Sequence, residues 1–182
     1  MHKTVIMDTN VYGELLIEEK SEEIISRIDK DDSLYIYGVD IISKELQDVP
    51  SDKKIKGQVF KEVVTSTYKS LIDEELKTSP VARYIASQYY KKYNELRKSR
   101  KHQKSVREKE LKYTEEDLKN DFLIIAIASL KNVDIIISAD QRTMLSSIAK
   151  ATYEIVNKGD DLRTPNFIDY FEFKKRYARW IF

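Results

Sequence analysis

Acidic side chains stand at several points of this sequence where they could act together on a substrate. Asp8 follows a short apolar run, and Asp140 follows another run of the same kind near the end of the chain. Such runs are typical of strands buried on both faces, and parallel sheets bind ligands outside the carboxyl ends of their strands. Two further acids are expected on helices whose ends meet that edge. The four candidate catalytic residues are Asp8, Glu45, Asp121 and Asp140.

A cluster of carboxylates predicts a metal site. Acids packed within a few ångströms repel one another and would otherwise have to take up protons. A hard divalent cation relieves this repulsion, and oxygen ligands favour Mg²⁺ or Mn²⁺. The same four acids are therefore the candidate metal ligands. Such a cation acidifies a bound water, orients a phosphate and stabilises negative charge, so the expected chemistry is phosphodiester hydrolysis.

Polar residues beside these acids are candidates for supporting roles. Thr9, Asn10 and Ser138 adjoin the two strand ends, where they could bond an acid or a metal-bound water, or only pack. Asp117 lies four residues before Asp121 and therefore on the same helical face. It is either a further acid of the site or, as we favour, a partner of the positive helix N-terminus.

Two of the acids also have simpler interpretations. A single Asp after a strand most often caps a turn or a helix, and Asp140 could cap a helix that begins at Gln141. Glu45 could be a solvated helix residue.

The composition narrows the chemistry further. The chain has 182 residues, which favours one domain, and 41% hydrophobic residues, which suffice for a core. It has no cysteine, so disulfides, zinc thiolates and thiol nucleophiles are excluded. Its two histidines, His2 and His102, leave little room for a histidine-based site. No apolar stretch is long enough for a membrane span or a signal peptide, so we expect a cytoplasmic protein with no membrane partner.

Alternating strands and helices must position these residues. Strands are predicted at 4–7, 34–37, 134–138 and 153–156. Helices are predicted at about 10–28, from 41 to before Pro50, at about 54–76, from Pro80, from Thr114 and from Thr164 with Pro165. This βα alternation predicts an α/β fold with a parallel sheet.

The sequence resembles the PIN-domain nucleases in four motifs that occur in the family's order. The matching segments are Val5–Val11 (VIMDTNV), Ser43–Leu46 (SKEL), Asn120–Ala128 (NDFLIIAIA) and Ile136–Asp140 (IISAD). Arg163–Phe167 (RTPNF) is similar to a Thr-Pro segment that often follows the last strand of the family. The segment from about 52 to 114 is longer than in the smallest toxin-type members.

The resemblance implies a three-layer α/β/α sandwich with a central parallel sheet and an enlarged helical insertion. It also implies a Mg²⁺- or Mn²⁺-dependent endoribonuclease, with RNA as the substrate. Many relatives are VapC-type toxins paired with a small antitoxin, and others process or degrade RNA. A non-catalytic PIN-fold scaffold that binds RNA or protein is the alternative. The expected organisation is a single domain over 1–182 with a basic helical insertion at about 78–113.

The insertion carries a strong positive charge. Residues 91–112 include ten cations and three acids, and four tyrosines lie at 84, 89, 90 and 93. Phosphate attraction and base stacking use these residue types, while a solvated helical arm is the alternative. The candidate RNA-binding residues are Arg97, Lys98, Arg100 and Lys101. The aromatic segment 167–182 is expected to pack on the core or on a second copy in a homodimer.

Overall fold

The computed structural model describes residues 2–101 and 113–178, and within them the chain divides into two compact units. Unit 1 takes its residues from Met1–Lys77, Val133–Ala139 and Asn166–Phe182. Unit 2 takes its residues from Thr78–Asn132 and Asp140–Pro165. The predicted single domain over 1–182 stays a prediction, and each unit is described by itself below.

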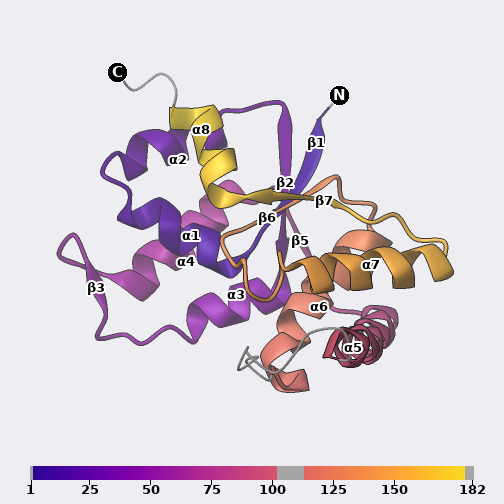
Figure 1. Cartoon of the computed structure of the whole chain (residues 1–182). Helices are drawn as coiled ribbons and strands as arrows, with labels where there is room; N and C mark the ends of the chain where they lie inside the picture. Colours follow the sequence, from indigo (N-terminus) through magenta and orange to yellow (C-terminus); the bar gives the residue numbers. More distant parts are fainter. Residues whose placement is uncertain (1, 102–112, 179–182) are drawn as a thin grey trace. The chain divides into compact units, whose positions relative to one another are not determined.

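Unit 1 is built on a five-stranded parallel sheet in the order β5-β2-β1-β6-β7 (Figure 1). Its strands are β1 (Lys3–Met7), β2 (Leu34–Val39), β5 (Glu74–Leu76), β6 (Ile135–Ser138) and β7 (Asn166–Asp169). Every neighbouring pair is parallel. The strand order reverses beside β1, because β2 pairs with one edge of β1 and β6 pairs with the other. Ligands of open parallel sheets bind at such a reversal.

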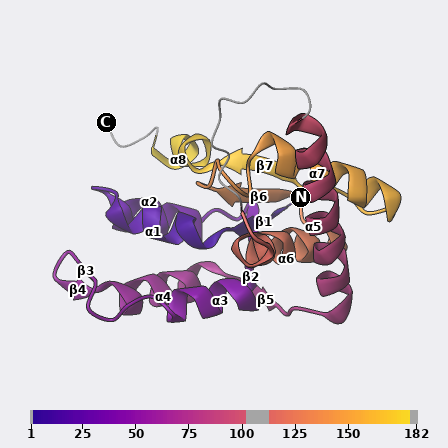
Figure 2. The same cartoon turned by 60° about the horizontal axis from the view of Figure 1, so that its bottom comes forward.

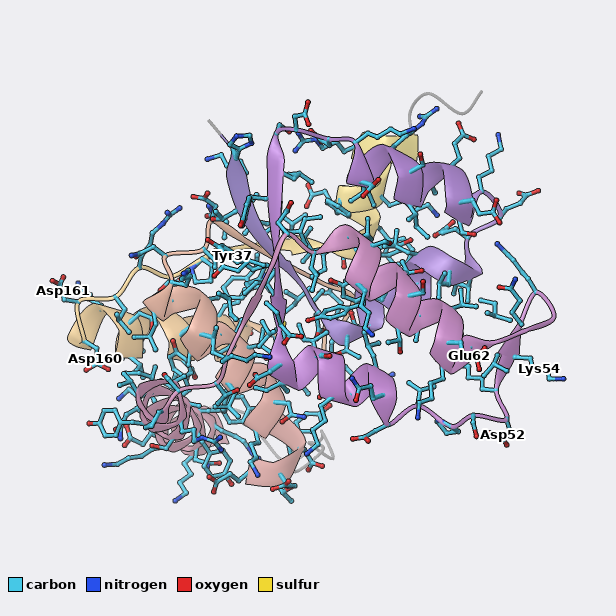
Figure 3. All side chains as sticks on the ribbon, turned by 180° about the vertical axis from the view of Figure 1, so that it is seen from behind. Tyr37, Asp52, Lys54, Glu62, Asp160 and Asp161 are labelled. Carbon is cyan, nitrogen blue, oxygen red and sulfur yellow. The ribbon has the colours of Figure 1, made fainter. Side chains whose placement is uncertain are left out.

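Five helices and a short hairpin complete unit 1 (Figure 2). The helices are α1 (Thr9–Ile17), α2 (Ser21–Asp29), α3 (Asp40–Gln47), α4 (Phe60–Leu71) and α8 (Tyr170–Ala178). The hairpin joins β3 (Lys54–Ile55) to β4 (Gln58–Val59), and Figure 3 labels Lys54 at its start and Asp52 two residues earlier. The structure therefore confirms the α/β class, with a parallel sheet flanked by helices, and it is consistent with the predicted three-layer sandwich.

The helix predicted at about 10–28 is two helices, because the chain leaves helical geometry at Glu18. Contacts from distant segments hold this residue. Lys56 donates to its carbonyl oxygen, at 3.1 Å, and Tyr170 donates to its carboxylate at 3.0 Å. Lys174 forms an ion pair with the same carboxylate, at 2.6 Å. The sequence has no Pro at this point and no signal for the break.

The predicted helix at 54–76 was also wrong in extent. Only Phe60–Leu71 is helical, with the hairpin before it and β5 after it. Asp73 fixes this last junction, because its backbone N–H donates to the carbonyl of Ile36 and its carboxylate accepts the Ile36 N–H. The strand β5 thus depends on pairing with β2 rather than on its own sequence, EEL.

A tight contact packs α4 against the end of β2. The Tyr68 hydroxyl donates to the carbonyl of Val39 at 3.2 Å, and its ring meets Tyr12 edge-on with centroids 5.3 Å apart. A Cβ at Gly38 would lie 2.4 Å from the Tyr68 hydroxyl oxygen and 2.8 Å from Cδ1 of Ile72. Glycine is therefore required at residue 38 for this close approach.

Unit 2 contains α5 (Pro80–Lys101), α6 (Glu115–Leu130) and α7 (Ser147–Gly159), with α5 in contact with both other helices. The predicted strand at 153–156 was wrong, because these residues lie within α7. Ser146 caps this helix by accepting the Ala149 N–H at 3.2 Å. Figure 3 labels Asp160 and Asp161 just beyond the end of the helix.

The predicted helix start at Thr164 and Pro165 was wrong as well. The residues after Pro165 form β7, and the C-terminal helix begins only at Tyr170. Thr164 instead accepts a hydrogen bond from the buried Asn157 amide, at 2.9 Å. The predicted start at Thr114 is confirmed, since this residue caps α6.

Buried aromatic rings form much of the unit 2 core. Tyr89 meets Phe122 and Tyr153 edge-on, and Tyr93 also meets Phe122. Tyr89 donates to the Asn157 side chain, whose amide donates to Ser129. Burial raises the pKa of Tyr89 to about 12, against the opposing effect of its hydrogen bonds with Ser129 and Asn157.

Within 2–101 and 113–178, no helix has the length and apolar character needed to cross a membrane.

Candidate functional site

Asp8 lies at the point where β1 ends and the order of the strands reverses. Its backbone N–H donates to the carbonyl of Ile137 in β6, at 2.8 Å, so the residue continues the β1–β6 pairing. It is also the N-cap of α1, and its side chain accepts the Thr9 N–H at 2.8 Å. The carboxylate is held between a strand and a helix N-terminus, which favours a negative charge.

Hydrogen bonds from β6 and from the first turn of α1 fix the Asp8 carboxylate. Its Oδ2 atom accepts the Ser138 hydroxyl at 2.7 Å and the Asn10 amide at 2.6 Å. Asn10 in turn accepts the Ala139 N–H through its Oδ1 atom, at 2.9 Å. Asp8 is only 5% exposed and Ser138 is fully buried. Donors of this kind stabilise the ionised form of a buried carboxylate.

Thr9 connects Asp8 to a second acid. Its N–H bonds Asp8, and its hydroxyl donates to Oε2 of Glu45 on α3. Glu45 is half-buried. Of the four predicted acids, Asp8 and Glu45 belong to unit 1, and one threonine bridges them.

A buried phenol near Asp8 was not anticipated from the sequence. Tyr12 lies four residues after Asp8 and is fully buried on α1. Burial, followed by the charges of Tyr68 and Asp8, raises the pKa of Tyr12 well above its ordinary value. The i, i+4 spacing from Asp8 was the signal that could have identified it.

Asp140 belongs to unit 2, where it caps a turn. Its Oδ1 atom accepts the backbone N–H groups of Arg142 and Thr143, at 2.7 and 3.0 Å. Its Oδ2 atom accepts the Thr143 hydroxyl at 2.6 Å. Burial acts to raise the pKa of Asp140, but the bonds from Thr143 and Arg142 and the Arg142 charge outweigh it, so that the pKa lies below its ordinary value. No helix begins at Gln141, since residues 141–145 form a turn.

The other two predicted acids of unit 2 lie on α6. Asp121 is half-buried in the middle of this helix. Asp117 is exposed and forms a capping box with Thr114, whose N–H donates to its carboxylate at 2.7 Å. Hydrogen bonds from the Thr114 N–H and hydroxyl lower the pKa of Asp117. Its observed role is therefore at the helix N-terminus.

The predicted ligands are of the chemical type that binds a hard cation. All four predicted ligands present carboxylate oxygens, the atoms that Mg²⁺ and Mn²⁺ prefer. Among the residues that the structure describes, however, no group of three or more His, Cys, Asp or Glu side chains is arranged to hold a metal ion. Within unit 1, the donors are the pair Asp8 and Glu45.

The predicted RNA-binding residues lie at the C-terminal end of α5. Arg97 is half-buried and Lys98 is exposed, and Arg100 and Lys101 are the last two residues of the helix. Of the ten cations at 91–112, those at 104, 107, 109 and 112 lie outside the described residues.

Comparisons with known proteins give little further information. No protein-family model matches the chain, and no curated protein matches it. Among solved structures, it is similar to a chain in the crystal structure of VapBC2 from Rickettsia felis bound to a DNA fragment from their promoter. The two chains are 14% identical, the alignment covers 91% of this chain and 98% of that chain, and the TM-score is 0.46. A likeness this distant carries no argument about function.

Proposed function

We propose that this protein is a divalent-metal-dependent endoribonuclease that hydrolyses phosphodiester bonds of RNA. The observation that supports the proposal best is the Asp8 carboxylate, which is buried at the strand-order reversal and joined to Glu45 through Thr9. A carboxyl group buried among hydrogen-bond donors at the reversal of a parallel sheet is typical of a binding or catalytic site. The four sequence motifs support the same activity.

Each acid has a role in the proposed site. Asp8, Glu45, Asp121 and Asp140 would hold Mg²⁺ or Mn²⁺. When bound, the ion supplies an acidified water and compensates the charge of the phosphate. The residues of the chain around them hold the acids in place: Ser138 and Asn10 orient Asp8, and Thr9 fixes its separation from Glu45.

Cleavage of labelled single-stranded RNA by the purified chain tests this function. We expect cleavage with Mg²⁺ or Mn²⁺, none in excess chelator, and recovery when either ion is restored. Asp8→Asn should abolish cleavage, whereas Asp52→Asn, at an exposed acid of the same unit, should not change it. Undiminished cleavage in chelator would contradict metal dependence. Cleavage by Asp8→Asn at the wild-type rate would remove Asp8 from the mechanism.

A scaffold that binds RNA or protein without cutting is the second candidate. It is favoured by the lack, among the described residues, of three acids already arranged around one metal position. The Asp8→Asn comparison separates the two candidates. If the chain is a scaffold, the wild type and Asp8→Asn would both bind RNA, and neither protein would cut it.

The sequence resemblance also supports proposals about the cellular setting. We propose a cytoplasmic role as the toxin of a toxin–antitoxin pair or as an RNA-processing nuclease. A small antitoxin protein and a second copy of the chain are the proposed protein partners. Sedimentation of the purified chain, alone and co-expressed with the product of a small neighbouring reading frame, tests both.

A further inference from the structure

The first half of α5 exposes an aromatic ring among cations. Tyr84 is 59% exposed, and the side chains of Arg83 and Lys91 are exposed on the same helix. In contrast, Tyr89 and Tyr93 are buried and meet other rings edge-on. They belong to the core and present no ring face to a ligand. Tyr84 is therefore the tyrosine of this segment that is best placed to stack on a base.

Two hollows of unit 2 border α5, and the Tyr84 ring lines one of them. One, of about 150 Å³, lies between α5 and α6, and Arg83, Ser87 and Tyr90 contribute to its wall. The other, of about 260 Å³, lies between α5 and α7, and its lining includes Tyr84 and Lys91. Residues spaced by three or four positions share a helix face, so Arg83, Tyr84, Ser87 and Lys91 form a continuous ridge between the hollows.

The charge of α5 suits a polyanion. The helix contains seven Lys and Arg residues and a single acid, Glu95. Lys92 pairs with Glu95 at 2.8 Å, while the described residues offer the Arg83 guanidinium no ion pair. Closely spaced cations along a helix attract phosphates, and an exposed ring among them adds stacking that tolerates any base sequence.

We propose that this face of α5 binds single-stranded RNA, with a base stacked on Tyr84 and the neighbouring phosphates held by Arg83 and Lys91. The proposal deepens the proposed function and rests on it, since it places the substrate strand on unit 2. It differs from a general electrostatic arm because it requires unpaired bases at one ring.

Binding without cleavage tests the proposal. Fluorescence anisotropy of a labelled single-stranded RNA is measured with the full chain in excess chelator, so that affinity is read independently of cutting. We expect Tyr84→Ala to raise the Kd about fivefold or more, and Tyr84→Phe to retain nearly wild-type affinity. Phe171→Ala is the matched control, because Phe171 is an equally exposed ring (61%) in unit 1. Its Kd should equal that of the wild type.

Two further measurements distinguish the contribution of base stacking from that of charge: the dependence of the Kd on salt concentration, and the Kd for duplex RNA. Arg83→Ala and Lys91→Ala should each reduce the log–log salt slope by about 0.7, whereas Tyr84→Ala should leave the slope unchanged. Lys69→Ala, at an exposed cation of α4, is the control for general charge. For a blunt RNA duplex, whose bases are already stacked, Tyr84→Ala should not change the Kd.

The outcomes distinguish this inference from the proposed function. An unchanged Kd for Tyr84→Ala on single-stranded RNA would overturn the inference, even if the chain cuts RNA. An equal increase in the Kd of Tyr84→Ala for duplex RNA would also overturn it. The same holds if Tyr84→Ala weakens binding to a protein partner and leaves RNA binding unchanged. A Tyr84-dependent Kd in a chain that never cuts RNA would support the inference and contradict the nuclease function.

Discussion

The carboxylate of Asp8 accepts a 2.7 Å hydrogen bond from the hydroxyl of Ser138, a residue 130 positions away in the sequence. The bond joins the ends of two adjacent strands where the order of the sheet reverses. It makes one half of the proposed site depend on β1 and β6 together.

This pair should be strongly coupled in stability. Ser138→Ala removes a donor from a buried carboxylate, so we expect it to cost about 1–3 kcal/mol of unfolding free energy. Asp8→Asn should cost a similar amount, because an amide presents its NH₂ group to donors, yet the chain should stay folded. The double variant should lose much less unfolding free energy than the sum of the losses in the two single variants. Urea unfolding of all four proteins measures the coupling, and additivity within about 0.5 kcal/mol would show that the bond contributes nothing.

Gly38→Ala should destabilise the chain by about 1–3 kcal/mol, because the new methyl group overlaps the Tyr68 hydroxyl. Tyr68→Phe alone should cost about 1 kcal/mol, because it removes the hydrogen bond to Val39. In the Gly38→Ala background the same change should instead recover part of the lost stability, since it removes the nearest clashing atom while Cδ1 of Ile72 stays close. Gly159→Ala is the control, because its Cβ would meet nothing within 4 Å. If Tyr68→Phe is equally harmful in both backgrounds, the hydroxyl is not the source of the clash.

Thr143 should make the stability of the chain depend on pH through Asp140. Because the folded pKa of Asp140 lies below its ordinary value, its contribution is present at neutral pH and is lost as the pH falls from about 4 through the folded pKa. Thr143→Val should raise this pKa and lower stability at pH 7. The difference from wild type should shrink in acid.

NMR titration of the carboxyl carbon and urea unfolding between pH 7 and 2.5 check this prediction. Thr65→Val is the control, because the Thr65 hydroxyl is buried without a hydrogen-bond partner in the described structure. It should be neutral or stabilising at every pH. A difference for Thr143→Val that stays constant with pH would separate Thr143 from the ionisation of Asp140.

The basic end of α5 should contribute to RNA binding through charge alone. Changing Arg97, Lys98, Arg100 and Lys101 to Ala should weaken binding and reduce the salt slope by about 0.7 for each phosphate that the variant no longer neutralises. Cleavage at saturating RNA should change much less, because the proposed metal ligands are untouched. Parallel salt slopes for the wild type and the variant would identify this end as a solvated arm.

Local patterns predicted the elements whose sequences carry their own signal. The buried strands β1, β2 and β6 and the capped start of α6 belong to this group. The segment 153–156 was misassigned because a short apolar run fits a strand or a buried helix. The buried positions Ala149, Thr152, Tyr153 and Asn157 follow a helical period that becomes evident only over a longer window. The strand β5 and the break at Glu18 depend on contacts with distant segments, so no local pattern could predict them.

The candidate site, like the fold, was predictable only where sequence order or local spacing determines the contacts. Asp8, Asn10 and Ser138 meet because adjacent parallel strands end at one edge, a consequence of topology that the sequence order implies. The Thr143 bonds to Asp140 follow a spacing of three residues that is typical of capped turns. The Thr9–Glu45 bond depends on how α3 packs in unit 1. The local sequence of either segment does not predict such packing.

The pairing of the central strand has a consequence for synthesis on the ribosome. One edge of β1 pairs with β6, which begins more than a hundred residues later in the sequence, so β1 leaves the ribosome well before this partner. Until β6 has left the exit tunnel, the Asp8 carboxylate lacks the Ser138 hydroxyl donor, and the Asp8 backbone N–H lacks the Ile137 carbonyl that accepts it. A nascent chain that has released β1 but not β6 would lack both of these contacts, so the proposed nuclease could not act on the RNA around it before β6 has emerged.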